Sequence, residues 1–138
     1  MEELIKKELI RKALEARKMS YSPYSGFAVG AALMDSEGDI YTGCNIENAS
    51  YPATVCAERT AFFKAVSDGV REFKMIAIVG GCTEHLEEYA FPCGICRQVM
   101  SEFCSGDFEV IAAKNTDDYK CFKLKELLPH SFGTESLQ

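Results

Sequence analysis

Two cysteine motifs, each at the start of a predicted helix, place the strongest constraint on the fold of this 138-residue chain. One is C-A-E at residues 56–58 and the other is P-C-G-I-C at residues 92–96. Residues three apart share a helical face, so Cys93 and Cys96 can hold the same metal ion. Pro92 suits a helix start, because its missing N–H would have no helical partner there. A fold that brings Cys56 alongside this pair creates a site of three sulfurs, so we expect the two helix starts to meet.

The chemistry of these residues points to a catalytic zinc site. Catalytic zinc has three protein ligands and keeps its fourth position open for water, whereas structural zinc has four protein ligands. Glu58 stands two residues after Cys56, so its carboxylate can reach a zinc-bound water without binding the metal. The positive ends of the two helices stabilise cysteine thiolates. The sequence therefore predicts one Zn²⁺ ion per subunit, bound by Cys56, Cys93 and Cys96.

Two other interpretations of these cysteines stay open at this point. Cys93 and Cys96 have the spacing of a redox-active dithiol, although that interpretation leaves the C-A-E motif without a role. A closed structural zinc site would arise if Cys44, Cys82 or His85 supplied a fourth ligand. Metal content with no exchangeable water position would favour the closed site.

The remaining cysteines carry no motif. The total of seven is odd, which argues against a disulfide scaffold. The four outside the motifs are expected to be small buried hydrophobic residues: Cys44, Cys82, Cys104 and Cys121. The two histidines, His85 and His130, are expected at the surface or in loops.

Elsewhere the chain alternates helices with short apolar strands. The hydrophobic spacing predicts helices over 2–19, 55–68 and 93–103, and strands over 27–34, 40–44, 74–79, 108–113 and 119–124. A short Leu-rich turn follows the last strand. This order favours one α/β domain over residues 1–138, in which helices cover a mixed sheet.

Charge and hydropathy exclude several classes of partner. The chain has 15 Lys and Arg against 21 Asp and Glu, a net charge of −6, and a nucleic-acid binder needs a cationic groove. No apolar run approaches the ~18–20 residues of a membrane helix. The charged N-terminal segment also lacks the apolar region of a signal peptide. The sequence predicts a cytoplasmic protein that acts on a small molecule, with neither a nucleic-acid polymer nor a membrane as partner.

With these residues in view, the chain resembles the cytidine deaminase family, specifically its small homotetrameric zinc enzymes. The matching motifs are Y-S-P-Y-S at 21–25, G-C-N-I-E-N at 43–48, C-A-E-R at 56–59 and P-C-G-I-C-R-Q at 92–98. The resemblance covers residues 21–132, nearly the whole chain. It implies a three-layer α/β/α sandwich with a five-stranded mixed sheet, assembled as a homotetramer in which neighbouring subunits complete each active site.

The resemblance also implies a role for individual residues. Cys56, Cys93 and Cys96 match the zinc ligands, and Glu58 matches the proton shuttle. The implied substrate-binding residues are Ala57, Phe27 at the pyrimidine, Asn45 and Glu47 at the ribose hydroxyls, Tyr51 at a subunit interface and Phe132 over the base in another protomer's pocket.

Two of these roles can be weighed from the residues themselves. Asn45 and Glu47 are two apart in an extended segment, so both side chains can face one way and offer a donor and acceptors to vicinal hydroxyls. Phe27 lies just inside a strand, where an aromatic residue belongs to a core as often as to a pocket.

The implied reaction is the hydrolytic deamination of free cytidine and deoxycytidine to uridine or deoxyuridine plus ammonia in pyrimidine salvage, catalysed by a hydrolase acting on C–N bonds in cyclic amidines. Zinc-bound water, deprotonated by Glu58, attacks C4 of cytosine, and Glu58 carries the proton to N3 and to the leaving ammonia. Arg59 is expected to draw negative charge off the cysteine sulfurs. The alternatives are a deaminase of another free aminopyrimidine, and a zinc-stabilised oligomeric binding module without turnover.

Overall fold

The elements observed in the computed structural model, which describes residues 1–137, follow the predicted order of helices and strands. They are α1 (Glu2–Arg17), β1 (Ala28–Asp35), β2 (Ile40–Cys44), α2 (Ala57–Ser67), β3 (Phe73–Gly81), α3 (Gly94–Phe103), β4 (Glu109–Asn115), β5 (Asp118–Lys123) and α4 (Leu124–Leu127). Short 3-10 helices, η1 and η2, lie at Tyr51–Ala53 and Thr134–Leu137. The fifth strand is confirmed, and the Leu-rich turn after it is the single helical turn α4.

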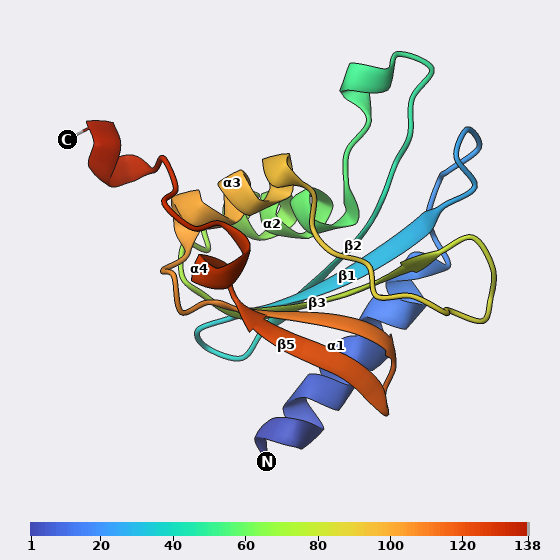
Figure 1. The fold of residues 1–138 in the computed structure, drawn as a ribbon, viewed down its shortest axis with the longest axis horizontal. Helices are drawn as coiled ribbons and strands as arrows, with labels where there is room; N and C mark the ends of the chain where they lie inside the picture. Colours follow the sequence, from blue (N-terminus) through green and yellow to red (C-terminus); the bar gives the residue numbers. More distant parts are fainter. Residues whose placement is uncertain (138) are drawn as a thin grey trace.

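The strands form one five-stranded mixed sheet in the order β2-β1-β3-β4-β5. β3 and β4 run parallel, and the other three neighbouring pairs are antiparallel. α1 covers one face of the sheet, while α2 and α3 cover the other (Figure 1). The predicted three-layer α/β/α sandwich is thereby confirmed.

Alternation along the strands divides the buried side chains into two cores. On β3, Met75, Ala77 and Val79 pack toward α1, whereas Ile76 and Ile78 pack toward α2 and α3. Successive side chains of a strand point to opposite faces, so a strand covered by helices on both sides is apolar at every position. This explains why these strands are continuous apolar runs in the sequence.

A glycine on β2 brings α2 unusually close to the sheet. A Cβ atom added to Gly43 would lie 2.4 Å from the backbone oxygen of Ala57, the first residue of α2. Only a residue without a side chain fits such a contact. The sheet therefore fixes the first turn of α2, which is where the C-A-E motif lies.

Two segments extend from the sandwich. The chain between β2 and α2, which carries η1, projects beyond the end of the sheet, and the chain after α4 leads away to the C-terminus (Figure 1). Among residues 1–137, no helix is both long and apolar enough to cross a membrane.

Candidate active site

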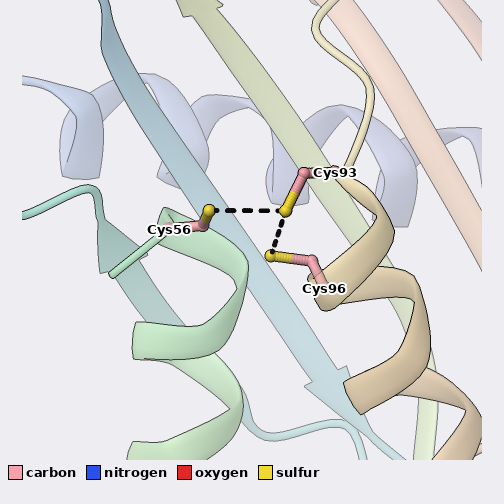
Figure 2. A group of neighbouring side chains, drawn as sticks. All are labelled: Cys56, Cys93 and Cys96. Atoms are coloured by element: carbon pink, nitrogen blue, oxygen red, sulfur yellow. Dashed lines mark hydrogen bonds between the residues drawn. The ribbon is translucent and has the colours of Figure 1, made fainter. Parts of the chain in front are cut away.

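The three motif cysteines meet where α2 and α3 begin. Cys56 is the N-cap of α2 and Cys93 is the N-cap of α3, with Cys96 in the first turn of α3. The Cys56 and Cys93 Sγ atoms are 3.7 Å apart, and the Cys93 and Cys96 Sγ atoms are 3.6 Å apart (Figure 2). Sulfurs around a tetrahedral zinc with Zn–S bonds of ~2.3 Å lie about 3.8 Å from one another. The spacing of the sulfurs therefore suits zinc.

This group of sulfurs has no fourth side-chain ligand. All three Sγ atoms lie within 4.8 Å of one another, and within residues 1–137 no further His, Cys, Asp or Glu joins them. In particular, Cys44, Cys82 and His85 are not members of the cluster. A tetrahedral ion here keeps one position for a non-protein ligand, which is the pattern of catalytic rather than structural zinc.

Of Cys56 and Cys96, Cys56 loses its proton more readily, because its pKa is lowered whereas that of Cys96 is raised. A hydrogen bond from Cys96 lowers the pKa of the Cys56 thiol to about 5, and the guanidinium of Arg59 adds to the effect. The pKa of Cys96 is raised because its proton is held in that same hydrogen bond and its sulfur is buried. A metal ion replaces such shared protons, because coordinating thiols are deprotonated. The cysteines are free in this structure, with no disulfide between Cys93 and Cys96.

Arg59 lies beside the sulfurs on α2. Its Nη2 donates a hydrogen bond to the Cys56 Sγ over 3.4 Å. Its Nε–H is the buried side-chain nitrogen that lacks a hydrogen-bond partner among the residues described. Three thiolates around Zn²⁺ carry excess negative charge, so a cation that donates to them fits the donor set and offsets that charge.

Glu58 is a carboxylate removed from water. Only 4% of its surface is exposed, and this burial raises the pKa of its carboxyl to about 7. A carboxyl group with a pKa near neutrality can accept a proton and return it at physiological pH. Glu58 follows Cys56 by two residues, so the first turn of α2 places the base next to the sulfurs.

A cavity of about 320 Å³ opens at the sulfurs. Its lining includes six of the residues expected at the site: Phe27, Asn45, Cys56, Ala57, Glu58 and Cys93. Phe27 is partly exposed and borders this cavity, so it belongs to a pocket wall rather than to either core.

The side chain of Asn45 is largely engaged by the protein itself. Its Oδ1 accepts hydrogen bonds from the Val29 N–H over 2.9 Å and from the Ser20 hydroxyl over 2.5 Å. Its Nδ2 donates to the Phe27 carbonyl over 2.8 Å. The amide has a second N–H, which has no protein partner among residues 1–137 and is the donor left for a ligand.

Glu47 lies in a neighbouring cavity rather than in the first one. A separate hollow of about 420 Å³ is lined by Glu47 and Tyr51, and Thr54 borders both cavities. The carboxylate of Glu47 accepts from the Tyr24 N–H over 2.9 Å, from the Ser25 N–H over 3.1 Å and from the Ser25 hydroxyl. The Ser25 hydroxyl does most to hold the pKa of Glu47 below its usual range. Asn45 and Glu47 are thus close in sequence but line two different cavities.

Tyr51 and Phe132 are exposed aromatic residues. Tyr51 lies in η1 and makes an edge-to-face pair with Tyr24, their ring centroids 6.2 Å apart. Phe132 is 61% exposed and borders neither of the two cavities. The Phe132 carbonyl accepts a hydrogen bond from the Gln98 side chain over 2.8 Å. A role for Phe132 at a substrate would therefore have to be in another copy of the chain.

The expectation that the spare cysteines are buried is wrong. Cys82 and Cys121 are exposed, and Cys44 and Cys104 are half-buried. Cys82 follows the last residue of β3, and Cys121 lies on the edge strand β5, which explains their exposure. The histidines are at the surface as expected.

Sequence reasoning missed a group of residues that line the cavity. They flank the ligands in sequence or lie on the central strands: Val29, Thr54, Val55, Ile78, Tyr89, Ala90 and Phe91. Their position in the sequence could have identified most of them, because the residues just before Cys56 and Cys93 must pass close to the metal site.

Comparison with known proteins gives a consistent result. The sequence model of the cytidine and deoxycytidylate deaminase zinc-binding region matches residues 4–112. A cytidine deaminase of Sporosarcina psychrophila is 50% identical over 130 residues, covering 94% of this chain and 93% of that protein. A probable cytidine deaminase of Dictyostelium discoideum is 45% identical, covering 93% and 84%.

Solved structures agree with the sequence relatives. The crystal structure of cytidine deaminase from Burkholderia pseudomallei superposes with a TM-score of 0.83 at 44% identity, covering 91% of this chain and 97% of that one. The crystal structure of cytidine deaminase from Mycobacterium tuberculosis gives a TM-score of 0.76 at 35% identity, with coverage of 91% and 95%. The similarity thus extends over almost the full length of each protein.

Proposed function

The chain belongs to the cytidine and deoxycytidylate deaminase family, and from this premise we propose that Glu58 and the three-sulfur site formed by Cys56, Cys93 and Cys96 carry out its reaction. The chain is a zinc-dependent hydrolase that converts free cytidine to uridine and ammonia. One observation supports the residue assignment above all others. The buried Glu58 lines the same cavity as Cys56 and Cys93, two members of the open three-sulfur cluster.

Cys56, Cys93 and Cys96 would hold the zinc. When bound, zinc supplies a water that ionises near neutral pH and serves as the nucleophile for C4 of the pyrimidine. Glu58 accepts the proton of that water and passes it to N3 of the ring. The same carboxyl group then moves the hydroxyl proton to the amino nitrogen, so that ammonia leaves and the carbonyl of uridine remains. A carboxyl pKa of about 7 suits both the acceptance and the donation of this proton.

The other cavity residues orient the nucleoside. Phe27 offers an aromatic wall for the pyrimidine, and Ala57 leaves room for the ring next to Glu58. The free N–H of Asn45 can donate to a ribose hydroxyl. The carboxylate of Glu47, which lines the neighbouring cavity, can accept hydrogen bonds from ribose hydroxyls. Cytidine and deoxycytidine share the 3′-hydroxyl, so deoxycytidine is proposed as a second substrate.

A homotetramer in the cytoplasm, acting in pyrimidine salvage, completes the proposal. The assembly is supported by the exposure of Tyr51 and by the absence of Phe132 from the lining of its own cavity. Each Phe132 would cover the base in a neighbouring subunit, and each Tyr51 would lie at an interface. The projecting segments that carry these two residues are available for such contacts (Figure 1).

Ammonia release from cytidine by the zinc-loaded protein tests the residue assignment. We expect Glu58→Gln to reduce kcat by about 10²- to 10⁴-fold, because the proton carrier is lost. Zinc content should remain at one ion per chain, because Glu58 is not a ligand. Cys93→Ala should lose the zinc, whereas the matched variant Cys82→Ala, at an exposed cysteine outside the cluster, should retain it.

The free base cytosine is the substrate control. It should react far more slowly than cytidine, because polar groups of the sugar site are left unpaired. A Glu58→Gln protein that deaminates cytidine at the wild-type rate would contradict the assignment of the proton carrier. A protein with one zinc per chain that leaves cytidine unchanged would point instead to another free aminopyrimidine as substrate.

A further inference from the structure

One wall of the cavity is built by the segment just before α3. Tyr89, Ala90 and Phe91 line the cavity together with Cys93. The start of α2 contributes Cys56, Ala57 and Glu58 to the same lining, and α2 and α3 begin on either side of the three sulfurs (Figure 2). This wall is separate from the metal ligands and from the residues assigned above.

Contacts of two aromatic residues, Phe91 and Tyr89, pack this wall against the β4–β5 hairpin. The Phe91 ring meets the Phe122 ring of β5 edge to face, with centroids 5.5 Å apart and an interplanar angle of 66°. The Tyr89 hydroxyl donates a hydrogen bond to Asp118, and Lys114 lies over the Tyr89 ring at 4.6 Å from its centroid. Phe91 is therefore held by its own partner and is not a free surface side chain, although 47% of it is exposed.

The surroundings of Gly80 on β3 show that this wall comes close to Phe27. A Cβ atom added to Gly80 would lie 3.1 Å from both the Phe27 ring and the Ala90 side chain. The two side chains thus converge over the same point of β3. A flat ring that enters along Phe27 meets the 89–91 segment at one of its edges.

The reaction fixes which edge of the pyrimidine that is. C4 must lie at the sulfurs, and N3 must face Glu58, which exchanges a proton with it. N1 and the sugar lie across the ring from C4, toward Asn45. The remaining ring neighbour of C4 is C5, which lies across the C4–N1 axis from N3 and therefore points away from Glu58, toward the opposite wall.

On the basis of the function proposed above, we propose that Phe91, supported by Phe122, is a specificity-determining residue that limits the size of substituents at C5 of the pyrimidine. The wall admits a hydrogen at C5 and disfavours a methyl or larger group. Cytidine is then preferred over 5-methylcytidine by steric exclusion rather than by a hydrogen bond. The class of substrate selected is an aminopyrimidine nucleoside unsubstituted at C5.

The test is the ratio of kcat/KM for 5-methylcytidine to kcat/KM for cytidine. Phe91→Ala should raise this ratio by roughly tenfold or more, since one misplaced methyl group changes kcat/KM by about 10- to 200-fold. Phe91→Trp should lower the ratio. Phe122→Ala should raise it to a smaller extent, because Phe91 remains but loses its support.

A matched control is available on α2. Phe63 is 48% exposed, nearly the same as Phe91, and does not line the cavity, so Phe63→Ala should leave the ratio unchanged. Zinc content and circular dichroism show whether each variant is folded. If Phe91→Ala fails to fold, Phe91→Leu and Phe122→Leu replace it, with the same direction expected.

The outcomes separate this inference from the function on which it rests. If the wild-type protein does not deaminate cytidine, the proposed function is wrong. If it does, and Phe91→Ala and Phe91→Leu raise the KM for both nucleosides without changing the ratio, the C5 assignment is wrong. A Phe63→Ala variant that changes the ratio as much as Phe91→Ala would also overturn it.

Discussion

Two polar side chains around the cavities, Asn45 and Glu47, form hydrogen bonds that stabilise the protein backbone. Asn45 binds the backbone at Phe27 and Val29, and Glu47 binds the backbone at Tyr24 and Ser25. Both residues therefore hold the chain segment that leads into β1 and carries Phe27. A substitution at either position would move the aromatic wall in addition to removing the proposed sugar contact.

Arg59 offers a prediction at the scale of one residue. Its Nη2 donates to the Cys56 sulfur, so Arg59→Ala leaves more negative charge on the ligands. The nucleophilic water then ionises at higher pH, because a more negative ligand set disfavours its conjugate base. We expect a lower kcat/KM and an acidic limb of the pH profile displaced to higher pH.

Two further variants make the Arg59 result interpretable. Arg59→Lys retains a cation and should restore part of the displacement. Arg71→Ala removes an exposed arginine beyond the opposite end of α2 and should leave the profile unchanged. An Arg59→Ala profile that superposes on the wild-type profile would show that the guanidinium does not tune the site.

At the scale of elements, the site depends on how closely α2 lies against β2. Gly43→Ala places a methyl group where the Ala57 backbone oxygen now lies, so the first turn of α2 must shift. We expect a loss of about 1–3 kcal/mol in the free energy of unfolding, which is typical of overpacking. Zinc affinity should fall too, because Cys56 moves with that turn while Cys93 and Cys96 stay with α3.

Urea unfolding and a zinc competition titration measure these two effects. Gly133→Ala is the control, because no atom lies within 4 Å of a Cβ added there and its backbone needs no positive φ. Equal unfolding midpoints and equal zinc affinities for Gly43→Ala and the wild-type protein would show that α2 can adjust without cost.

At the scale of the whole molecule, the proposed exchange of Phe132 between subunits makes a prediction about mixed assemblies. Phe132→Ala and Glu58→Gln should each be nearly inactive alone. Refolded together, they form assemblies in which a pocket with an intact Glu58 is covered by an intact Phe132 from the other chain. Activity should therefore rise well above the sum of the two separate preparations.

Ammonia release from cytidine is the readout, and light scattering of the mixture reports its oligomeric state. A mixture that never exceeds the sum of its parts, although the subunits have exchanged, would place Phe132 outside its neighbour's pocket. Wild-type protein refolded with Glu58→Gln provides the control for loss of activity through dilution.

The order of elements and the identity of the metal site follow from local patterns. Helical spacing, continuous apolar strands and turn residues depend on neighbours within a few positions, and they predict the three long helices and five strands to within about two residues at each end, although not the short η1 and η2. The pair Cys93 and Cys96 is set by the helix itself, because positions three apart share a face. These features need no knowledge of the distant parts of the chain.

The walls of the cavity were decided by the tertiary structure alone. Phe91 lines the cavity because β5, far along the chain, supplies Phe122 as its support. Asn45 and Glu47 border different hollows because Asn45 is bound at Phe27 and Val29, where β1 begins, whereas Glu47 is bound at Tyr24. Contacts between residues distant in sequence leave no periodic signal. The sequence by itself therefore determined the layers and the members of the three-sulfur cluster, whereas the shape of the cavity beside them required the packed chain.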